Sequence, residues 1–296
     1  MFKKISVKVA VFVNLILLLI IVAGASFIIY QQDKSLEEQY LSRGKSLSIF
    51  GAKAVSRIME EAIDNGVFTV AEAFDVDYVP ISNLDPPKYH TKYDFYTDKA
   101  ILTLIDEFLK DKDILYATAM DVNGYIPTHN MRYQQPLTGD KEKDTVGNRT
   151  KRIFTDPIGS KASKNEEEGF LQVYKRDTGE TTWDIASPIY VKGKLWGNFR
   201  VGIAQDTLKS AKRGLMIHLA VIMLAILLLA TLLVLLIVRF MLKPLTEFTR
   251  VASQMADGMV EQKIVAKSND ELGELADVLE RMRISMKAAM DRLSKK

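Results

Sequence analysis

The sequence contains no cysteine among its 296 residues. This absence excludes disulfide bridges, cysteine-ligated zinc, iron–sulfur clusters, thiol nucleophiles and covalently attached c-type haem. Histidine is also scarce, with three residues, so a metal site built on histidine would need carboxylate ligands as well. We therefore predict no metal ion and no cofactor. Any folded domain must be stabilised by its own core.

A large excess of one charge is also missing. The formal net charge is +3, and basic and acidic side chains are spread over the polar parts of the chain. No segment is basic enough to indicate nucleic-acid binding. The sequence also lacks a serine-nucleophile motif, a phosphate-binding loop and a histidine cluster. We therefore expect a protein that is not an enzyme.

Two long apolar runs stand out against this composition. Residues 9–30 read VAVFVNLILLLIIVAGASFIIY without a formal charge, and residues 215–238 read LMIHLAVIMLAILLLATLLVLLIV. As a helix, each is long enough to cross a hydrocarbon core of about 30 Å. The sequence predicts two transmembrane helices at these positions.

The flanking basic residues predict the orientation. Three lysines lie within residues 1–8, and Arg239 and Lys243 follow the second run. Because positive residues favour the cytoplasmic side, both ends of the chain are expected there, with residues 31–213 on the other side of the membrane. A cleaved signal peptide is the alternative for the first run, which contains the small residues Ala23, Gly24 and Ala25. The run continues to Tyr30, and this favours an uncleaved anchor.

The outer segment is predicted to be an α+β domain. Apolar residues recur at helical spacing from residue 31 to about 65, and a shorter helix is expected over residues 98–112. Four strand-like runs follow, at residues 114–121, 169–177, 181–191 and 195–204. Short turns between the later strands predict an antiparallel sheet.

This layout, together with five motifs, resembles the single Cache domain, a PAS-like sensor module of bacterial transmembrane receptors. The motifs are FDVDYVPISNLDPPKYHT, DVNGYIPTHN, NRTKRIFTD, YKRDTGE and SPIYVKGKLWGNFRVG. Their sequences are similar to those in the sensor half of methyl-accepting chemotaxis proteins. The resemblance implies a pocket against the sheet that binds a small solute.

The last strand suggests a candidate for ligand binding. Strand side chains alternate between faces, so Trp196 and Arg200 are expected opposite Phe199. An arginine fork on such a face can bind both oxygens of a small carboxylate, although a surface ion pair is the alternative. Arg149 and Arg152 lie in the long connection between strands, where cations either face solvent or turn inward toward an anion.

Four further residues complete the candidate ligand site. His129 is a ligand partner, a metal ligand or a buried neutral imidazole; Tyr125, Tyr174 and Trp183 either wall a pocket or fill the core. Asn123-Gly124, ahead of Tyr125, has the turn chemistry of a hairpin.

The inner segment, residues 239–293, carries two apolar seams at heptad spacing that are joined by an extended connector. This pattern predicts helices of a parallel coiled-coil bundle, completed by a homodimer. The segment resembles the HAMP domain, a relay module, with residues 294–296 as a tail. The matching residues are Pro244, Gly258, Val260, Ile264, Asp270, Glu271 and Gly273.

These features predict a transmembrane receptor that binds a small extracytoplasmic solute such as a carboxylate and relays a conformational change. Since little sequence follows the relay, we expect a separate cytoplasmic protein to read it, or a truncated chain. The alternatives are a haem- or metal-based redox sensor using His90 or His129, a membrane-anchored enzyme, or a ligand-free partner of another receptor.

Overall fold

The computed structural model describes residues 5–176, 179–265 and 270–293. Residues 1–4, with two of the lysines used for orientation, and the tail 294–296 lie outside the described residues. The chain forms two compact units. One comprises residues 29–216, and the other comprises the residues up to 28 together with those from 217 onwards.

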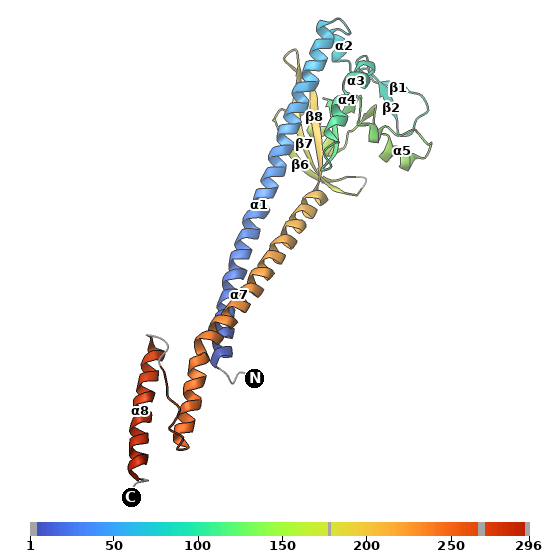
Figure 1. Ribbon diagram of the computed structural model, residues 1–296. Helices are drawn as coiled ribbons and strands as arrows, with labels where there is room; N and C mark the ends of the chain where they lie inside the picture. Colours follow the sequence, from blue (N-terminus) through green and yellow to red (C-terminus); the bar gives the residue numbers. More distant parts are fainter. Residues whose placement is uncertain (1–4, 177–178, 266–269, 294–296) are drawn as a thin grey trace. The chain divides into compact units, whose positions relative to one another are not determined.

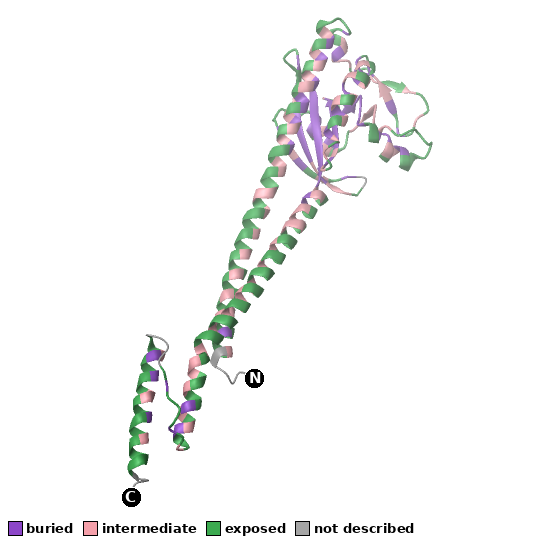
Figure 2. Cartoon of the chain, in the orientation of Figure 1, coloured by how far each residue is buried: buried purple, intermediate pink, exposed green. Residues whose placement is uncertain are grey.

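Two long helices carry the predicted spans. Helix α1 runs from Ile5 to Asp64, and α7 runs from Gln205 to Ala256. Their most apolar windows have mean hydropathies of 2.8 and 3.4, and no residue of either window is buried against protein. Figure 2 shows these stretches as mostly exposed. Exposed apolar helices of this length match membrane spans and differ from the core helices of a soluble domain.

A four-stranded antiparallel sheet forms the centre of the outer unit. Its strands are β3 (Ile114–Asp121), β6 (Phe170–Lys175), β7 (Thr181–Val191) and β8 (Lys194–Ala204). They lie in the order β3-β8-β7-β6, so β8 is central between β3 and β7. The predicted α+β class and antiparallel sheet are confirmed.

Short elements surround this sheet. They are α2 (Val70–Ala73), β1 (Val79–Ile81), β2 (Lys88–His90), α3 (Asp94–Ala100), α4 (Leu102–Phe108), β4 (Tyr125–Ile126), η1 (Met131–Tyr133), α5 (Lys141–Gly147), β5 (Arg152–Ile153) and α6 (Pro157–Ser163). The helix expected over 98–112 is therefore two short helices, of which the first begins earlier. Strand β1 pairs with β2, and β4 pairs with β5. Because β4 does not join the main sheet, the Asn123-Gly124 turn does not close a hairpin.

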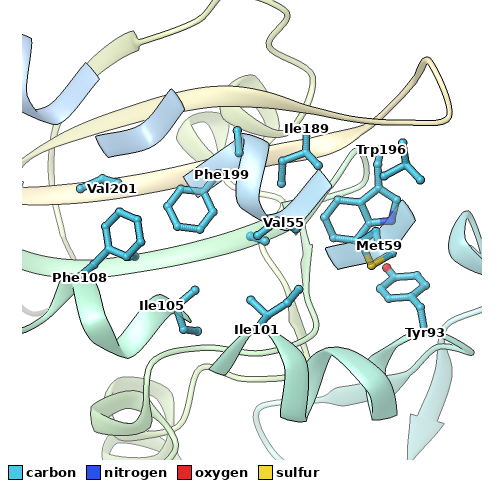
Figure 3. Packing of buried hydrophobic residues seen from close by; sticks show 14 of the residues in the cluster. Val55, Met59, Tyr93, Ile101, Ile105, Phe108, Ile189, Trp196, Phe199 and Val201 are labelled. Atoms are coloured by element: carbon cyan, nitrogen blue, oxygen red, sulfur yellow. The ribbon is translucent and has the colours of Figure 1, made fainter. Parts of the chain in front are cut away.

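The main core lies between α1, α3, α4 and one face of the sheet (Figure 3). Val55 and Met59 of α1 and Phe199 of β8 are fully buried in it. Burying a side chain of this size stabilises the fold by roughly 1.5–3 kcal/mol. The long helix is therefore held to the sheet over several turns at its outer end.

A β-bulge at Trp196 overturns the predicted side-chain alternation in β8. Gly197 pairs with Ile189 and Leu195 pairs with Tyr190, which leaves Trp196 as the extra residue. Trp196 consequently points into the same core as Phe199 and donates its indole N–H to the Ala73 carbonyl at 2.8 Å. A Cβ on Gly197 would lie 1.9 Å from the Met120 carbonyl oxygen, so the bulge requires glycine.

The inner unit joins α7 to α8 (Glu271–Leu293) through an extended connector, and the two helices run parallel (Figure 1). Val251 and Met255 of α7 pack against Ile264 of the connector and Ala276 of α8. Pro244 lies inside α7, where its missing N–H removes one helical hydrogen bond. In the spans, the Thr231 hydroxyl donates to the Asn14 side-chain oxygen at 2.7 Å.

Truncating the central core residue tests this packing. We expect Phe199→Ala to lower the free energy of unfolding by about 3–5 kcal/mol, because it removes a buried ring and leaves a cavity. Urea unfolding of the full chain in detergent, followed by tryptophan fluorescence, measures this loss, since both tryptophans lie in the outer unit. The exposed Val173→Ala is the control. A change below about 1 kcal/mol in Phe199→Ala would contradict the packing.

Candidate functional site

A cavity of about 440 Å³ lies on the sheet face opposite the main core. Its lining combines one polar sheet face with the segment between β4 and α6. The lining residues are Tyr116, Thr118, Ile126, His129, Arg149, Arg152, Phe154, Asp156, Ile158, Tyr174, Lys175, Arg176 and Arg200. Five of these carry a positive charge and one carries a negative charge, so the described lining favours an anion.

The floor of the cavity is a buried ion pair. Arg200 donates from Nε and Nη2 to the carboxylate of Asp184, with the shortest distance 2.7 Å, and the Tyr116 hydroxyl donates to the same carboxylate at 2.7 Å. Burial lowers the pKa of Arg200, but Asp184, Tyr116 and Tyr174 together raise it more, so the net pKa lies above its ordinary value. The fork that the sequence analysis assigned to a ligand carboxylate is thus engaged by Asp184.

Arg176, which sequence reasoning missed, lies between two aromatic rings. Its guanidinium lies 5.2 Å from the centroid of Tyr116 and 5.3 Å from that of Tyr133, and it donates to Glu180 at 2.6 Å. Burial lowers its pKa, whereas Tyr133, Tyr116 and Glu180 raise it to a net value above the ordinary one. Cation–π contacts therefore fix this cation in place at the cavity.

Arg149 reaches the cavity from the connection between α5 and β5, and Arg152 reaches it from the start of β5. Arg149 is 7% exposed and lies 5.9 Å from the Tyr133 ring centroid. Arg152 stacks on Phe154 at 5.0 Å and donates to the Thr145 carbonyl at 2.8 Å. Both predicted cations thus turn inward and line the cavity, as one of the two sequence alternatives stated.

His129 is a buried imidazole, 3% exposed. The Asn130 backbone N–H donates to its Nδ1 at 2.8 Å, so the proton of the neutral ring is on Nε2. Burial lowers the pKa of His129 well below its ordinary value, and nearby arginines, with Arg149 first, lower it further. The ring is therefore neutral, with an Nε2–H that has no protein acceptor among the described residues. The same arginines repel a metal cation from this position.

One wall of the cavity is apolar. Ile126, Phe154 and Ile158 lie on this side, and the first two belong to a small core cluster with Met120. A ligand that fits both walls needs an anionic group and an apolar surface.

The structure brings five of the eight predicted ligand residues together: His129, Arg149, Arg152, Tyr174 and Arg200. The other three do not line this cavity. Trp196 lies in the main core because of the bulge, and Trp183 faces the same core because it pairs with Ile203. Tyr125 is buried there and donates its hydroxyl to Asp94 at 3.0 Å. Tyr116, which also lines the cavity, was missed. It lies in a predicted strand, where alternation places it on the face opposite to Ala117.

Apart from Pro244, the predicted relay residues lie in the connector after α7 and in the first turn of α8. Gly258 has φ 82°, and Val260 and Ile264 are buried. Asp270 accepts from the backbone N–H groups of Leu272 and Gly273 at 3.1 and 3.2 Å, so it caps α8 just before Glu271. These contacts support the connector role that the sequence predicted.

Two residues of α8 that sequence reasoning missed hold the connector. Arg283 donates to the Val260 carbonyl at 2.7 Å, and Glu280 accepts from the Ile264 N–H at 2.9 Å. Arg283 also donates to Glu280, and this hydrogen bond lowers the pKa of Glu280 to about 2.

The neutral state of His129 predicts a pH dependence of stability. Its folded pKa lies below the ordinary 6.5, so below about pH 6.5 the unfolded chain binds a proton that the folded chain does not. The free energy of unfolding should therefore fall with falling pH, by up to about 1.4 kcal/mol per pH unit from this group. Urea unfolding at pH 7.5, 6.5 and 5.5 measures the slope. We expect the free energy of unfolding of His129→Gln to depend less on pH than that of the wild type. Equal dependence in the two proteins would exclude a contribution from His129.

The contacts of Arg283 predict how the connector responds when this side chain is replaced. Arg283→Met should release the connector, because the Val260 carbonyl loses its charged donor. We expect hydrogen exchange of residues 259–265 to rise about tenfold, whereas the exposed Arg281→Met serves as the control. Unchanged exchange in Arg283→Met would refute the role of this side chain.

The HAMP prediction is confirmed by comparison with protein families, because residues 236–294 match the HAMP domain. A search of curated proteins found no match to this chain. Among solved structures, the outer unit is similar to the sensory domain of the Campylobacter jejuni chemoreceptor Tlp3 with isoleucine bound, at 14% identity and a TM-score of 0.31. That match covers 61% of this chain and 65% of the other.

A second similar structure is the ligand-binding domain of the Pseudomonas aeruginosa PAO1 amino acid chemoreceptor PctC in complex with GABA. It shares 12% identity with a TM-score of 0.24, and the match covers 59% of this chain and 65% of the other. The chain thus spans slightly less than two thirds of the length of these domains. At such identity the likeness identifies no ligand. Two apolar helices flank the α+β unit and a HAMP domain follows the second, which is the layout of a sensor-plus-HAMP membrane receptor.

Proposed function

We propose that this chain is a transmembrane receptor of a bacterial inner membrane that binds a small carboxylate in the cavity on the polar face of the sheet. The observation that supports this function most directly is the charge of the cavity. Arg149, Arg152, Lys175, Arg176 and Arg200 line it with one carboxylate, Asp156, while Asp184 and Glu180 offset the charges of Arg200 and Arg176. A cavity of this size and charge supports a ligand sensor over a ligand-free partner.

His129 supplies a hydrogen-bond donor that does not depend on pH near neutrality. Its Nε2–H is suited to a carboxylate or carbonyl oxygen, and the apolar wall is suited to the hydrocarbon part of an organic acid. The ligand class is therefore an organic acid with a small apolar body, held by arginine and oriented by the imidazole.

The relay begins at the cavity floor. Arg200 lies four residues before the end of β8, and α7 follows β8 without an intervening residue. A ligand that binds one arrangement of β8 more tightly than another shifts the populations of the arrangements of α7. The HAMP domain, as part of a parallel homodimer, then changes its packing, and a cytoplasmic signalling partner reads the change.

Thermal unfolding against a panel of solutes tests the ligand class. The panel contains acetate, succinate, citrate, alanine, simple amines and divalent metals, added to the full chain in detergent. A ligand of the folded state present at a hundred times its Kd stabilises it by about 2.7 kcal/mol. We expect a carboxylate to raise the midpoint measured by tryptophan fluorescence. Stabilisation by amines or metals, with none by any acid, would contradict the proposal.

A substitution at the cavity locates the site. Arg152→Gln should weaken binding of the stabilising acid about 10- to 100-fold, because it removes a charge-assisted hydrogen bond. Arg57→Gln is the matched control, since Arg57 is an exposed arginine of the same unit. Isothermal titration measures both. Equal affinity in the two variants would place the site elsewhere.

A further inference from the structure

Lys88 on β2 is a buried lysine that does not line the cavity. It is 4% exposed, and its ammonium has no carboxylate partner among the described residues. Lysine is almost never buried to this extent without an ion pair. Its position therefore calls for a specific role.

Each hydrogen bond from the Lys88 ammonium goes to one short segment. Nζ donates to the side-chain oxygen of Asn148 at 2.6 Å and to the Thr150 carbonyl, and it lies 3.5 Å from the Asn148 carbonyl. Arg149 lies between these two residues, and Arg152 follows two residues later. Both arginines line the cavity. Lys88 thus bonds to the two residues on either side of a cavity cation.

The same segment is also held by backbone bonds. The Arg149 N–H donates to the Tyr133 carbonyl and the Lys151 N–H donates to the Ile126 carbonyl, each at 2.7 Å. Lys151 has a φ of 58°, which is rare for a residue with a side chain. The segment therefore turns sharply between two anchored ends. Without Lys88, the side-chain oxygen of Asn148 and the Thr150 carbonyl would lose the ammonium that donates to them.

The electrostatic setting of Lys88 extends to the cavity. Burial, followed by the charges of Arg152 and Lys151, lowers the pKa of Lys88 to about 8, while Asp144 of α5 opposes this shift. The positive charges of Lys88 and Arg152 thus repel each other. An anion bound at Arg152 would offset this repulsion and favour the protonated form of Lys88.

We propose that Lys88 is a positioning residue, whose ammonium holds the segment 148–152 so that Arg149 and Arg152 face the cavity, and whose charge is coupled to anion binding there. The positioning role is inferred from the contacts alone. The coupling to anion binding rests on the proposed function. By linkage, affinity for an anion falls as the pH rises through about 8, where Lys88 loses its charge.

This loss of affinity is distinguishable from unfolding. Between about pH 8 and the ordinary lysine pKa of 10.5, the unfolded chain binds the proton that folded Lys88 has released. The contribution of Lys88 to stability therefore rises with pH over this window. A weaker affinity at pH 9 in a protein whose unfolding midpoint has not fallen reports on the site itself.

Hydrogen exchange tests the positioning role without a ligand. Exchange of the amides of residues 148–152 is measured in the full chain in detergent for wild type, Lys88→Met, Lys88→Gln and the exposed control Lys99→Met. We expect exchange about tenfold faster in Lys88→Met, an intermediate effect in Lys88→Gln, which keeps a donor, and no effect in the control. Unchanged exchange in both Lys88 variants would overturn the positioning role.

Succinate binding at pH 7 and pH 9 tests the coupling. We expect the wild-type affinity to fall several-fold between these values and the affinity of Lys88→Gln to stay flat. Parallel profiles in the two proteins would overturn the coupling while leaving the proposed function intact. If wild type binds neither succinate nor any other acid of the panel, the proposed function and the coupling fail, and hydrogen exchange alone decides the positioning role.

Discussion

The buried Arg200–Asp184 pair is the interaction on which the arrangement of the outer unit depends. It lies at the centre of the sheet, on β8 and β7, two strands whose other face is mainly apolar. Desolvating two charges costs several kcal/mol, and the bidentate geometry with an added hydroxyl donor offsets much of that cost. Removing either partner would leave an uncompensated buried charge. The pair therefore fixes which face of the sheet is polar and makes its floor nearly neutral.

Because the floor is neutral, the positive charge of the cavity comes from its walls. Arg149 and Arg152 lie between α5 and α6, and Arg176 follows the edge strand β6, so these cations belong to other segments than the floor. A ligand that draws them together would act on β8 and on the segments that cover it. Only a difference in affinity between two arrangements can drive such a change, and a difference of 1.4 kcal/mol shifts their ratio about tenfold.

The sequence predicted the larger elements well, because their signals are long. The apolar runs, the heptad seams and the four strands of alternating residues correspond to α1, α7, α8 and the main sheet. The short pairs β1–β2 and β4–β5 were missed, since two- and three-residue strands have no periodicity. The turn at Asn123-Gly124 was read as a hairpin, but its following strand pairs with β5.

The candidate site was predictable only in part, for local physical reasons. Arginines in a long connection and on a sheet face were recognisable from residue type and alternation. A one-residue bulge reversed the face of Trp196, and alternation cannot reveal a bulge. Asp184 and Lys88 were not singled out, because an isolated aspartate in a strand or a lysine beside two prolines has no pattern. Only the fold brings Asp184 to Arg200 and Lys88 to Asn148.

The central claim is that the cavity and the HAMP domain share one conformational equilibrium. The absence of cysteine allows a clean measurement, in which a single cysteine at the exposed Met282 of α8 reports disulfide formation between two copies in membranes. The rate is compared with and without a saturating concentration of the acid that stabilises the outer unit. The account predicts that this acid changes the rate and that Arg152→Gln abolishes the change at the same concentration. An identical rate with and without an acid that is bound would contradict it.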